Sequence, residues 1–154
     1  MFDVLIIGGG ASSMSCAFIL GSAHQKPFAS DKKIAIITHQ KASSLQSALF
    51  NNAYGVSAGK LGSEILAEST KQLQELYPQI LQIPNEKVLK IEGTSGDFSV
   101  VTNKQIYAAK VIVIGIGASN PFTIEGLENF IIAHKKANPE KNKIQLQNDD
   151  HLVT

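Results

Sequence analysis

The sequence predicts an α/β fold in which a parallel sheet is combined with a three-stranded antiparallel β-meander. Three apolar runs that consist mainly of β-branched residues, at 4–7, 34–37 and 111–114, show no polar alternation. Such runs are typical of strands that are buried on both faces, as in parallel sheets. Short strand-like segments separated by glycine and asparagine turns precede the third run, which indicates the meander.

Length and composition indicate one domain that covers residues 1–154. Hydrophobic residues make up 44% of the chain and charged residues 18%, which excludes an intrinsically disordered chain. The formal net charge is +1, so we expect neither nucleic acid nor a membrane as a partner. The single cysteine, Cys16, cannot form an intramolecular disulfide, and this favours a cytoplasmic location.

The first strand runs into a glycine-rich turn at 8–10, and a helix is predicted to start at Ser12 or Ser13. Main-chain N–H groups of such a turn and of the first helical turn point at one spot, where the helix dipole adds positive charge. Glycine is needed because a Cβ would keep a diphosphate away from the backbone. We therefore predict a Rossmann-like, dinucleotide-binding fold; the alternative is a βαβ unit that holds no ligand. The residues predicted at the diphosphate are Gly8, Gly10, Ala11, Ser12 and Ser13.

The second strand, predicted at 33–38, completes the βαβ unit. In dinucleotide folds an acidic residue at the end of this strand accepts hydrogen bonds from a ribose hydroxyl. This chain has Thr38 and His39 there, and we predict that both lie at the ribose, without the charge assistance of a carboxylate. All 14 basic residues are lysines, and the absence of arginine after this strand disfavours NADP at this site.

The stretch between the second strand and the meander is predicted to hold one long helix. Residues 41–49 are expected to form a loop or a short helix, and 50–60 a loop. Apolar residues at helical spacing predict a helix over 61–77, with Gly62 or Ser63 as its cap and Pro78 at its end. A short strand is expected at 79–83.

The meander is predicted from three short strands at 86–92, 98–102 and 105–108, and the buried strand 111–114 follows as a separate element. That strand ends at a second glycine turn, which contains Gly115 and Gly117. Ligands of open α/β sheets bind at the carboxyl ends of the strands, so both glycines are predicted to contact the cofactor. Further strands are expected at 130–133 and 143–147.

In this order the parts resemble the FAD-binding half of thioredoxin reductase-like flavoproteins, in the pyridine nucleotide-disulfide oxidoreductase group. The opening segment 3–10 is similar to the family's D-V-h-I-I-G-G-G-P-A-G, with Ala11 in place of Pro and Ser13 in place of the last Gly. Residues 52–55 resemble its N-x-P-G segment, and 111–118 resemble its h-h-h-A-T-G-A turn. The resemblance covers the chain from residue 1 to about residue 126.

The resemblance implies a Rossmann-like FAD/NAD(P)-binding fold with FAD as cofactor and NAD(P)H as an electron donor. It also implies that Val88 lies at the adenine and that Asn52 is a further cofactor contact. The chain departs from the family pattern because it has no C-x-x-C pair. It also has no room for an NADPH domain, and the family's last flavin-site strand, P-G-h-h-A-x-G-D, is not found.

The leading functional prediction is an FAD-dependent oxidoreductase, or the FAD-binding part of one, without a redox-active cysteine pair. The alternative is a non-catalytic dinucleotide-binding module or a subunit of a larger flavoenzyme. A simple NAD-dependent dehydrogenase fits less well, because the meander takes the place of further βα units. No catalytic acid, base or nucleophile is assigned, and the four histidines show no metal-ligand spacing. The missing strand would leave an open sheet edge, which favours a homodimer or a partner subunit.

Overall fold

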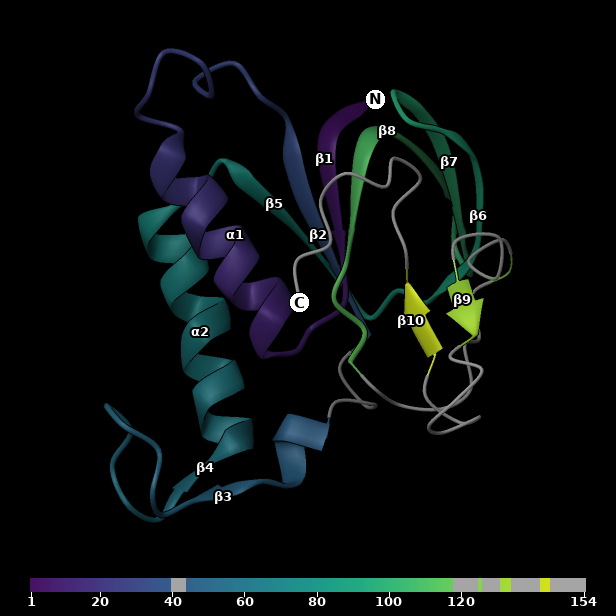
Figure 1. The fold of residues 1–154 in the computed structure, drawn as a ribbon. Coiled ribbons are helices and arrows are strands. Elements are labelled where there is room, and N and C mark those ends of the chain that lie inside the picture. The colour runs from purple at the N-terminus through teal and green to yellow at the C-terminus, as the bar shows by residue number, and fades with distance from the viewer. Residues whose placement is uncertain (40–43, 118–124, 126–130, 134–141, 145–154) are drawn as a thin grey trace.

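The computed structural model describes residues 1–39, 44–117, 125, 131–133 and 142–144, which Figure 1 shows in colour. Its main sheet has six strands in the order β5-β2-β1-β8-β7-β6. The first four run parallel, whereas β8, β7 and β6 are antiparallel neighbours. The predicted α/β fold with a parallel sheet and a meander is confirmed. The strands are β1 (Phe2–Ile7), β2 (Ile34–Thr38), β5 (Ile80–Pro84), β6 (Val88–Thr94), β7 (Asp97–Thr102) and β8 (Ile106–Ile114).

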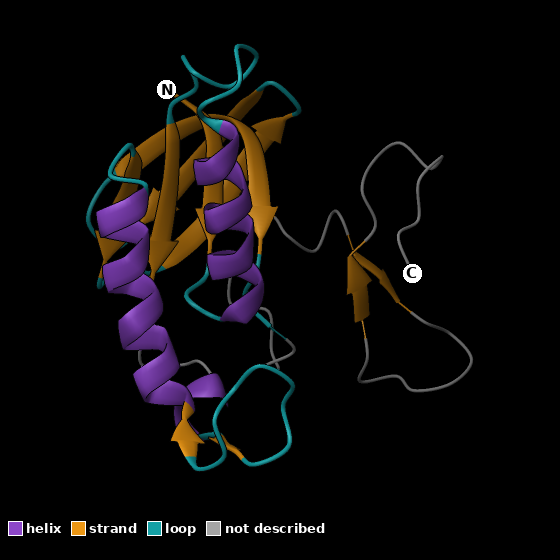
Figure 2. Ribbon diagram, turned by 90° about the vertical axis from the view of Figure 1, so that its left-hand side faces the viewer, coloured by secondary structure: helices purple, strands orange, loops and turns teal. Residues whose placement is uncertain are grey.

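Two helices, α1 (Ala11–Ala23) and α2 (Gly62–Leu76), lie side by side on one face of the sheet (Figures 1 and 2). Because successive side chains of a strand point to opposite faces, Ile6 and Ile36 face these helices. They form a first core with residues of both helices and neighbouring strands: Met14, Ala17, Ile34, Leu73 and Ile80. The near-continuous apolar runs of β1 and β2 follow from this burial on both faces.

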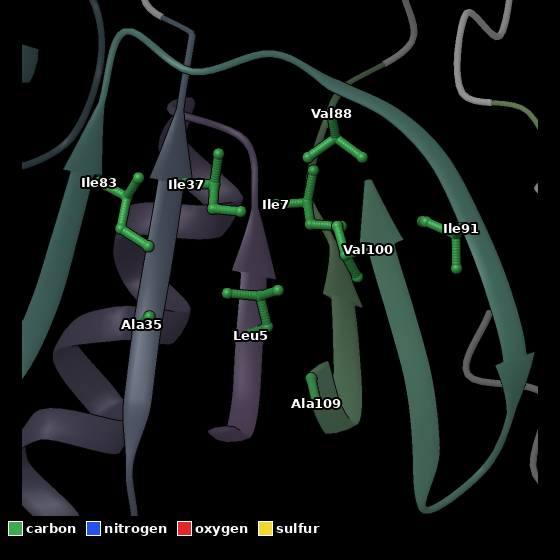
Figure 3. Close-up of a cluster of buried hydrophobic side chains, with 9 residues drawn as sticks. All are labelled: Leu5, Ile7, Ala35, Ile37, Ile83, Val88, Ile91, Val100 and Ala109. Carbon is green, nitrogen blue, oxygen red and sulfur yellow. The ribbon is translucent and has the colours of Figure 1, made fainter. Parts of the chain in front are cut away.

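The opposite face of the parallel strands packs against the meander. Leu5, Ile7 and Ile37 point away from the helices and into a second core, which Figure 3 shows from one side. The meander contributes buried side chains from each of its strands, namely Val88, Ile91, Val100 and Ala109. The meander therefore covers the sheet face that the helices leave open.

The connection between β5 and β6 shows how strongly the sheet curls. These strands are the two opposite edges of the sheet, yet only residues 85–87 join them. Four Cα steps can span at most about 14 Å, whereas five strand spacings in a flat sheet would measure about 24 Å. The sheet therefore has to curl around the second core, and residues 85–87 cross over its carboxyl edge (Figure 3). We call residues 85–87 the crossing segment.

Several element boundaries differ from the sequence predictions. The strands predicted at 105–108 and 111–114 are one strand, β8, whose first half pairs with β7 and whose second half pairs with β1. Helix α1 begins at Ala11, and Gly10 is its N-cap. The N-cap of α2 is Leu61, not Gly62 or Ser63, because the Glu64 carboxylate accepts the Leu61 N–H at 3.0 Å.

Short elements complete the described part of the chain. The segment predicted as loop or short helix contains a 3-10 helix, η2 (Ser44–Ser47). Two-residue strands, β3 (Leu49–Phe50) and β4 (Lys60–Leu61), pair as a small hairpin at the two ends of the predicted loop 50–60. The strands β9 (Ile131–Ala133) and β10 (Asn142–Ile144) overlap the two predicted late strands, whose remaining residues, 130 and 145–147, lie outside the described residues.

Candidate dinucleotide-binding site

The carboxyl ends of β1, β2 and β8 bring the two glycine turns and Thr38 together. The Gly8 N–H donates to the Ile37 carbonyl at 2.9 Å, and the Gly115 N–H donates to the Ile7 carbonyl at 2.8 Å. A Cβ added to Gly9 would lie 3.3 Å from the Thr38 Cβ, so Thr38 lies against the first turn. The sequence prediction that these segments meet at one sheet edge is thus consistent with the structure.

The two glycine turns lie in such close contact that a larger residue in place of Gly8 or Gly115 would clash with its surroundings. Gly8 has a φ of +126°, and a Cβ there would lie 2.3 Å from the Gly115 carbonyl oxygen. A Cβ on Gly115 would lie 2.0 Å from the Ser13 Oγ. Both distances are shorter than any ordinary van der Waals contact, so the carboxyl edge depends on glycine at both positions.

Ser13 connects α1 to both turns from behind. Its side chain is fully buried, and its hydroxyl donates to the Gly115 carbonyl at 3.1 Å, with the Ile7 carbonyl at 3.4 Å as a second acceptor. The hydroxyl is therefore occupied within the protein, and the residue as a whole is buried. The predicted role of Ser13 at the cofactor remains a prediction.

The first turn of α1 has the chemistry of an anion cradle. The helix begins its hydrogen bonding with Met14 N–H to the Gly10 carbonyl at 3.0 Å. The N–H groups of Ala11, Ser12 and Ser13 consequently have no acceptor within the helix. Ala11 and Ser12 are exposed, and the first turn contains no acidic residue that would compete with a phosphate. A diphosphate fits here, because main-chain donors and the helix dipole converge on a surface with small side chains.

The other predicted contact residues differ in their exposure and in the elements that carry them. Thr38 is 8% exposed, while its neighbour His39 is exposed. Gly117 is exposed just beyond β8 and has a φ of +77°. Asn52 is exposed in the β3–β4 hairpin, which lies next to the N-terminal end of α2 in Figures 1 and 2. The Val88 side chain is buried in the second core, so only its main chain can face an adenine.

A buried carboxylate beside the cradle was not predicted from the sequence. Glu86, in the crossing segment, is 3% exposed and accepts hydrogen bonds from the hydroxyls of Thr102 and Tyr107. Burial and the nearby Glu86 raise the pKa of the Tyr107 phenol, so it stays protonated and able to donate at neutral pH. A single glutamate before a strand is not a sequence motif, so the sequence gives no signal for this cluster.

The described residues also limit other chemistry. In that part of the chain no three His, Cys, Asp or Glu side chains lie together as a metal site would require. None of the helices seen there is long and apolar enough to cross a bilayer. Cys16 is partly buried in α1, and burial raises the pKa of its thiol, which disfavours a reactive thiolate.

Comparison with known families identifies this arrangement. Residues 2–154 match the family model described as pyridine nucleotide-disulphide oxidoreductase. The chain belongs to this family. The match extends over the glycine turns, the meander and β8, which are the same landmarks that carry the sequence resemblance. The family assignment made from the sequence is therefore confirmed.

Individual relatives agree with the family assignment but are much longer. The chain is 31% identical over 131 residues to a ferredoxin–NADP reductase from Geobacillus kaustophilus, covering 81% of this chain and 37% of that relative. An oxidoreductase structure from Agrobacterium tumefaciens has a TM-score of 0.65 at 27% identity and covers 84% of this chain and 41% of its own. A thioredoxin reductase from Gloeobacter violaceus, at 24% identity, shares the fold with a TM-score of 0.64, covering 79% of this chain and 38% of its own. The chain thus spans about two fifths of these oxidoreductases.

Proposed function

We propose that this chain is the FAD-binding part of an NAD(P)H-dependent flavoprotein oxidoreductase. The observation that carries the proposal is the cradle, in which two glycine turns and the start of α1 converge at the carboxyl edge of the sheet. The FAD diphosphate would bind at Gly8, Gly10, Ala11 and Ser12. When bound, the flavin would supply the redox chemistry, and the chain would hold and orient it.

The rest of the cofactor would extend from the cradle along the sheet edge. Its ribose would lie over Thr38 and His39, and its adenine at the main chain of Val88. Gly115 and Gly117 would line the side of the cradle formed by β8. Asn52 would reach the cofactor from the β3–β4 hairpin.

The protein partners and the electron donor of this chain are part of the same proposal. Two of the similar proteins are named as ferredoxin–NADP and thioredoxin reductases, which supports NAD(P)H as the electron donor. A homodimer or a second subunit, and a cytoplasmic location, remain predictions from the sequence. The 154 residues contain one cysteine, so an acceptor disulfide cannot form within them.

The first test is a visible absorption spectrum of the purified chain before and after addition of FAD. We expect the band of an oxidised, protein-bound flavin, because the cradle offers main-chain donors for the diphosphate. Gly10→Val should weaken FAD binding by about tenfold or more, since a branched side chain would fill the approach to the diphosphate. The φ of −89° and ψ of −173° at Gly10 suit valine, so the variant should still fold.

Ser15→Val is the matched control, because Ser15 is exposed on α1 but lies outside its first turn. It should bind FAD as the wild type does. Equal FAD binding by Gly10→Val and wild type would contradict the proposed cradle. No flavin band and no uptake of added FAD would favour the alternative of a non-catalytic dinucleotide-binding module or subunit.

A further inference from the structure

The buried carboxylate of Glu86 lies between the proposed cofactor site and the meander. Its main-chain N–H donates to the Thr38 carbonyl at 3.2 Å, so the crossing segment is hydrogen-bonded to the end of β2. Thr38 in turn lies against Gly9 of the cradle. A dinucleotide that runs from the cradle past Thr38 would therefore next meet the crossing segment.

The hydrogen bonds around Glu86 all point toward its carboxylate. The Tyr107 hydroxyl donates to Oε2 at 3.0 Å and accepts from the Gln105 side-chain amide at 2.6 Å. The Thr102 hydroxyl accepts the N–H groups of Lys104 and Gln105 at 3.1 and 3.0 Å. Its one proton goes to Glu86 Oε1, with the Gln105 carbonyl at 2.8 Å as a competing acceptor. The Glu86 carboxyl group thus accepts hydrogen bonds from two hydroxyls that come from β7 and β8.

The backbone of the crossing segment follows an irregular path. Asn85 adopts a left-handed φ of +57°, which asparagine tolerates better than other residues that carry a Cβ. Lys87, two residues later, is fixed at its N–H by the Asn103 side chain at 2.8 Å and at its carbonyl by the Asn103 N–H at 3.0 Å. Between these two residues, Glu86 is the only one of the segment whose side chain is buried. The carboxylate therefore fixes the middle of the segment against β7 and β8.

We propose that Glu86 is a positioning residue for the adenosine end of the dinucleotide site, because it fixes the crossing segment against the end of β2. This inference rests on the proposed function and adds a residue to it. Glu86 does not touch the cofactor; it acts through the main chain of residues 85–88. The diphosphate cradle, which is built from β1, β8 and α1, does not depend on it.

Calorimetric titration with two probes, ADP and inorganic diphosphate, tests whether Glu86 affects the adenosine end of the site and not the diphosphate cradle. Both probes can occupy the cradle, but only ADP carries the adenosine that would reach the crossing segment. In Glu86→Gln an amide NH₂ replaces one acceptor oxygen and faces a hydroxyl that needs an acceptor. We expect this variant to weaken ADP binding about tenfold and to leave diphosphate binding within about twofold of wild type.

Two further variants make the test decisive. Tyr107→Phe removes one of the two donors at the outer end of the network, and it should weaken ADP binding about threefold even if Glu86→Gln does not fold. Leu73→Ala is the control, because it removes buried apolar volume from the first core, on the other side of the sheet from the Glu86 hydrogen bonds. It should lower the melting temperature but leave the ADP to diphosphate ratio unchanged.

The outcomes separate this inference from the proposed function. Wild-type binding of neither probe would overturn the proposed function, and the role of Glu86 with it. Normal ADP binding by both Glu86→Gln and Tyr107→Phe would overturn only the role of Glu86. An equal loss of ADP and diphosphate binding would show that Glu86 acts on stability alone, and this would overturn the positioning role as well.

Discussion

At the scale of single residues, the contact between Ser13 and Gly115 makes the two glycine turns depend on each other. The Ser13 hydroxyl fills the space that a side chain at position 115 would need. At the same time it donates to the Gly115 carbonyl and so holds α1 against β8. A serine at this position therefore restricts its neighbour to glycine, while it supplies a hydrogen bond that a glycine at position 13 could not make.

We predict that Gly115→Ala destabilises the protein by about 1–3 kcal/mol through overpacking. Ser13→Ala should cost about 1 kcal/mol through the lost hydrogen bond. In the double variant the Oγ that the new Cβ would meet is gone, so the combined loss should be smaller than the sum by about 1 kcal/mol. Urea denaturation of the four proteins measures this coupling.

Gly96→Ala is the control for that cycle, because no atom lies within 4 Å of a Cβ added there. Its effect should add to that of Ser13→Ala without coupling, since the two positions do not touch. Strict additivity in the Gly115→Ala and Ser13→Ala pair would show that the turns do not pack as the structure describes.

At the scale of elements, Asp3 joins three strands at the amino end of the sheet. Its Oδ2 accepts the Lys33 N–H at 2.9 Å just before β2, and its Oδ1 pairs with Lys110 Nζ of β8 at 2.7 Å. These two contacts, with Lys110 as the larger cause, lower the pKa of the Asp3 carboxyl below its usual range. The folded state thus favours the ionised form of the Asp3 carboxyl group more than the unfolded state does.

We predict that Asp3→Asn lowers the melting temperature at pH 7 by a few degrees. The pKa of Asp3 is lower in the folded protein than in the unfolded chain. The contribution of Asp3 to stability is therefore fully present above the pKa of the unfolded state, and it is lost as the pH falls through the pKa of the folded state. The difference between wild type and Asp3→Asn should therefore narrow once the pH falls below about 4. Thermal melts from pH 7 downward measure this trend.

Asp31→Asn is the matched control, since Asp31 pairs with its chain neighbour Lys32 and, within the described part of the chain, forms no ion pair that links two strands. It should leave the melting temperature at pH 7 nearly unchanged. If the difference in melting temperature between wild type and Asp3→Asn stays constant down to acidic pH, the loss of stability comes from packing and not from the carboxylate charge.

The elements differ in how far the sequence predicts them. Strands β1 and β2 were predictable because unbroken apolar runs require burial on both faces, and the two cores provide it. The continuity of β8 was not, because Ala109 and Lys110 interrupt its apolar run at the point where the strand changes partners. The glycine cradle was predictable from adjacent residues, whereas the partners of Glu86 lie 16 and 21 positions away along the chain.

At the scale of the whole molecule, the two cores share the same strands. Leu5 and Ile6 are adjacent in β1 and fully buried, but they belong to opposite cores. The crossing segment also joins the two edges of the sheet, so β5 in the helical half is tied directly to β6 in the meander. Because the two cores share strands, unfolding of these strands in one core also exposes the other core to water. This favours a single cooperative unfolding transition.

The three tyrosines allow this cooperativity to be measured. Tyr77 packs edge to face on Phe18 in the helical layer, Tyr107 lies 6.1 Å from Phe2 at the meander, and Tyr54 is fully exposed. In a variant with Tyr54→Phe and Tyr107→Phe, fluorescence reports on the helical layer alone; with Tyr54→Phe and Tyr77→Phe it reports on the meander. Within each variant we expect the urea midpoint from fluorescence to equal that from far-UV circular dichroism, because both layers unfold together. A meander midpoint at lower urea than the circular dichroism midpoint would mean that the second core opens first and that the crossing segment does not couple the two halves.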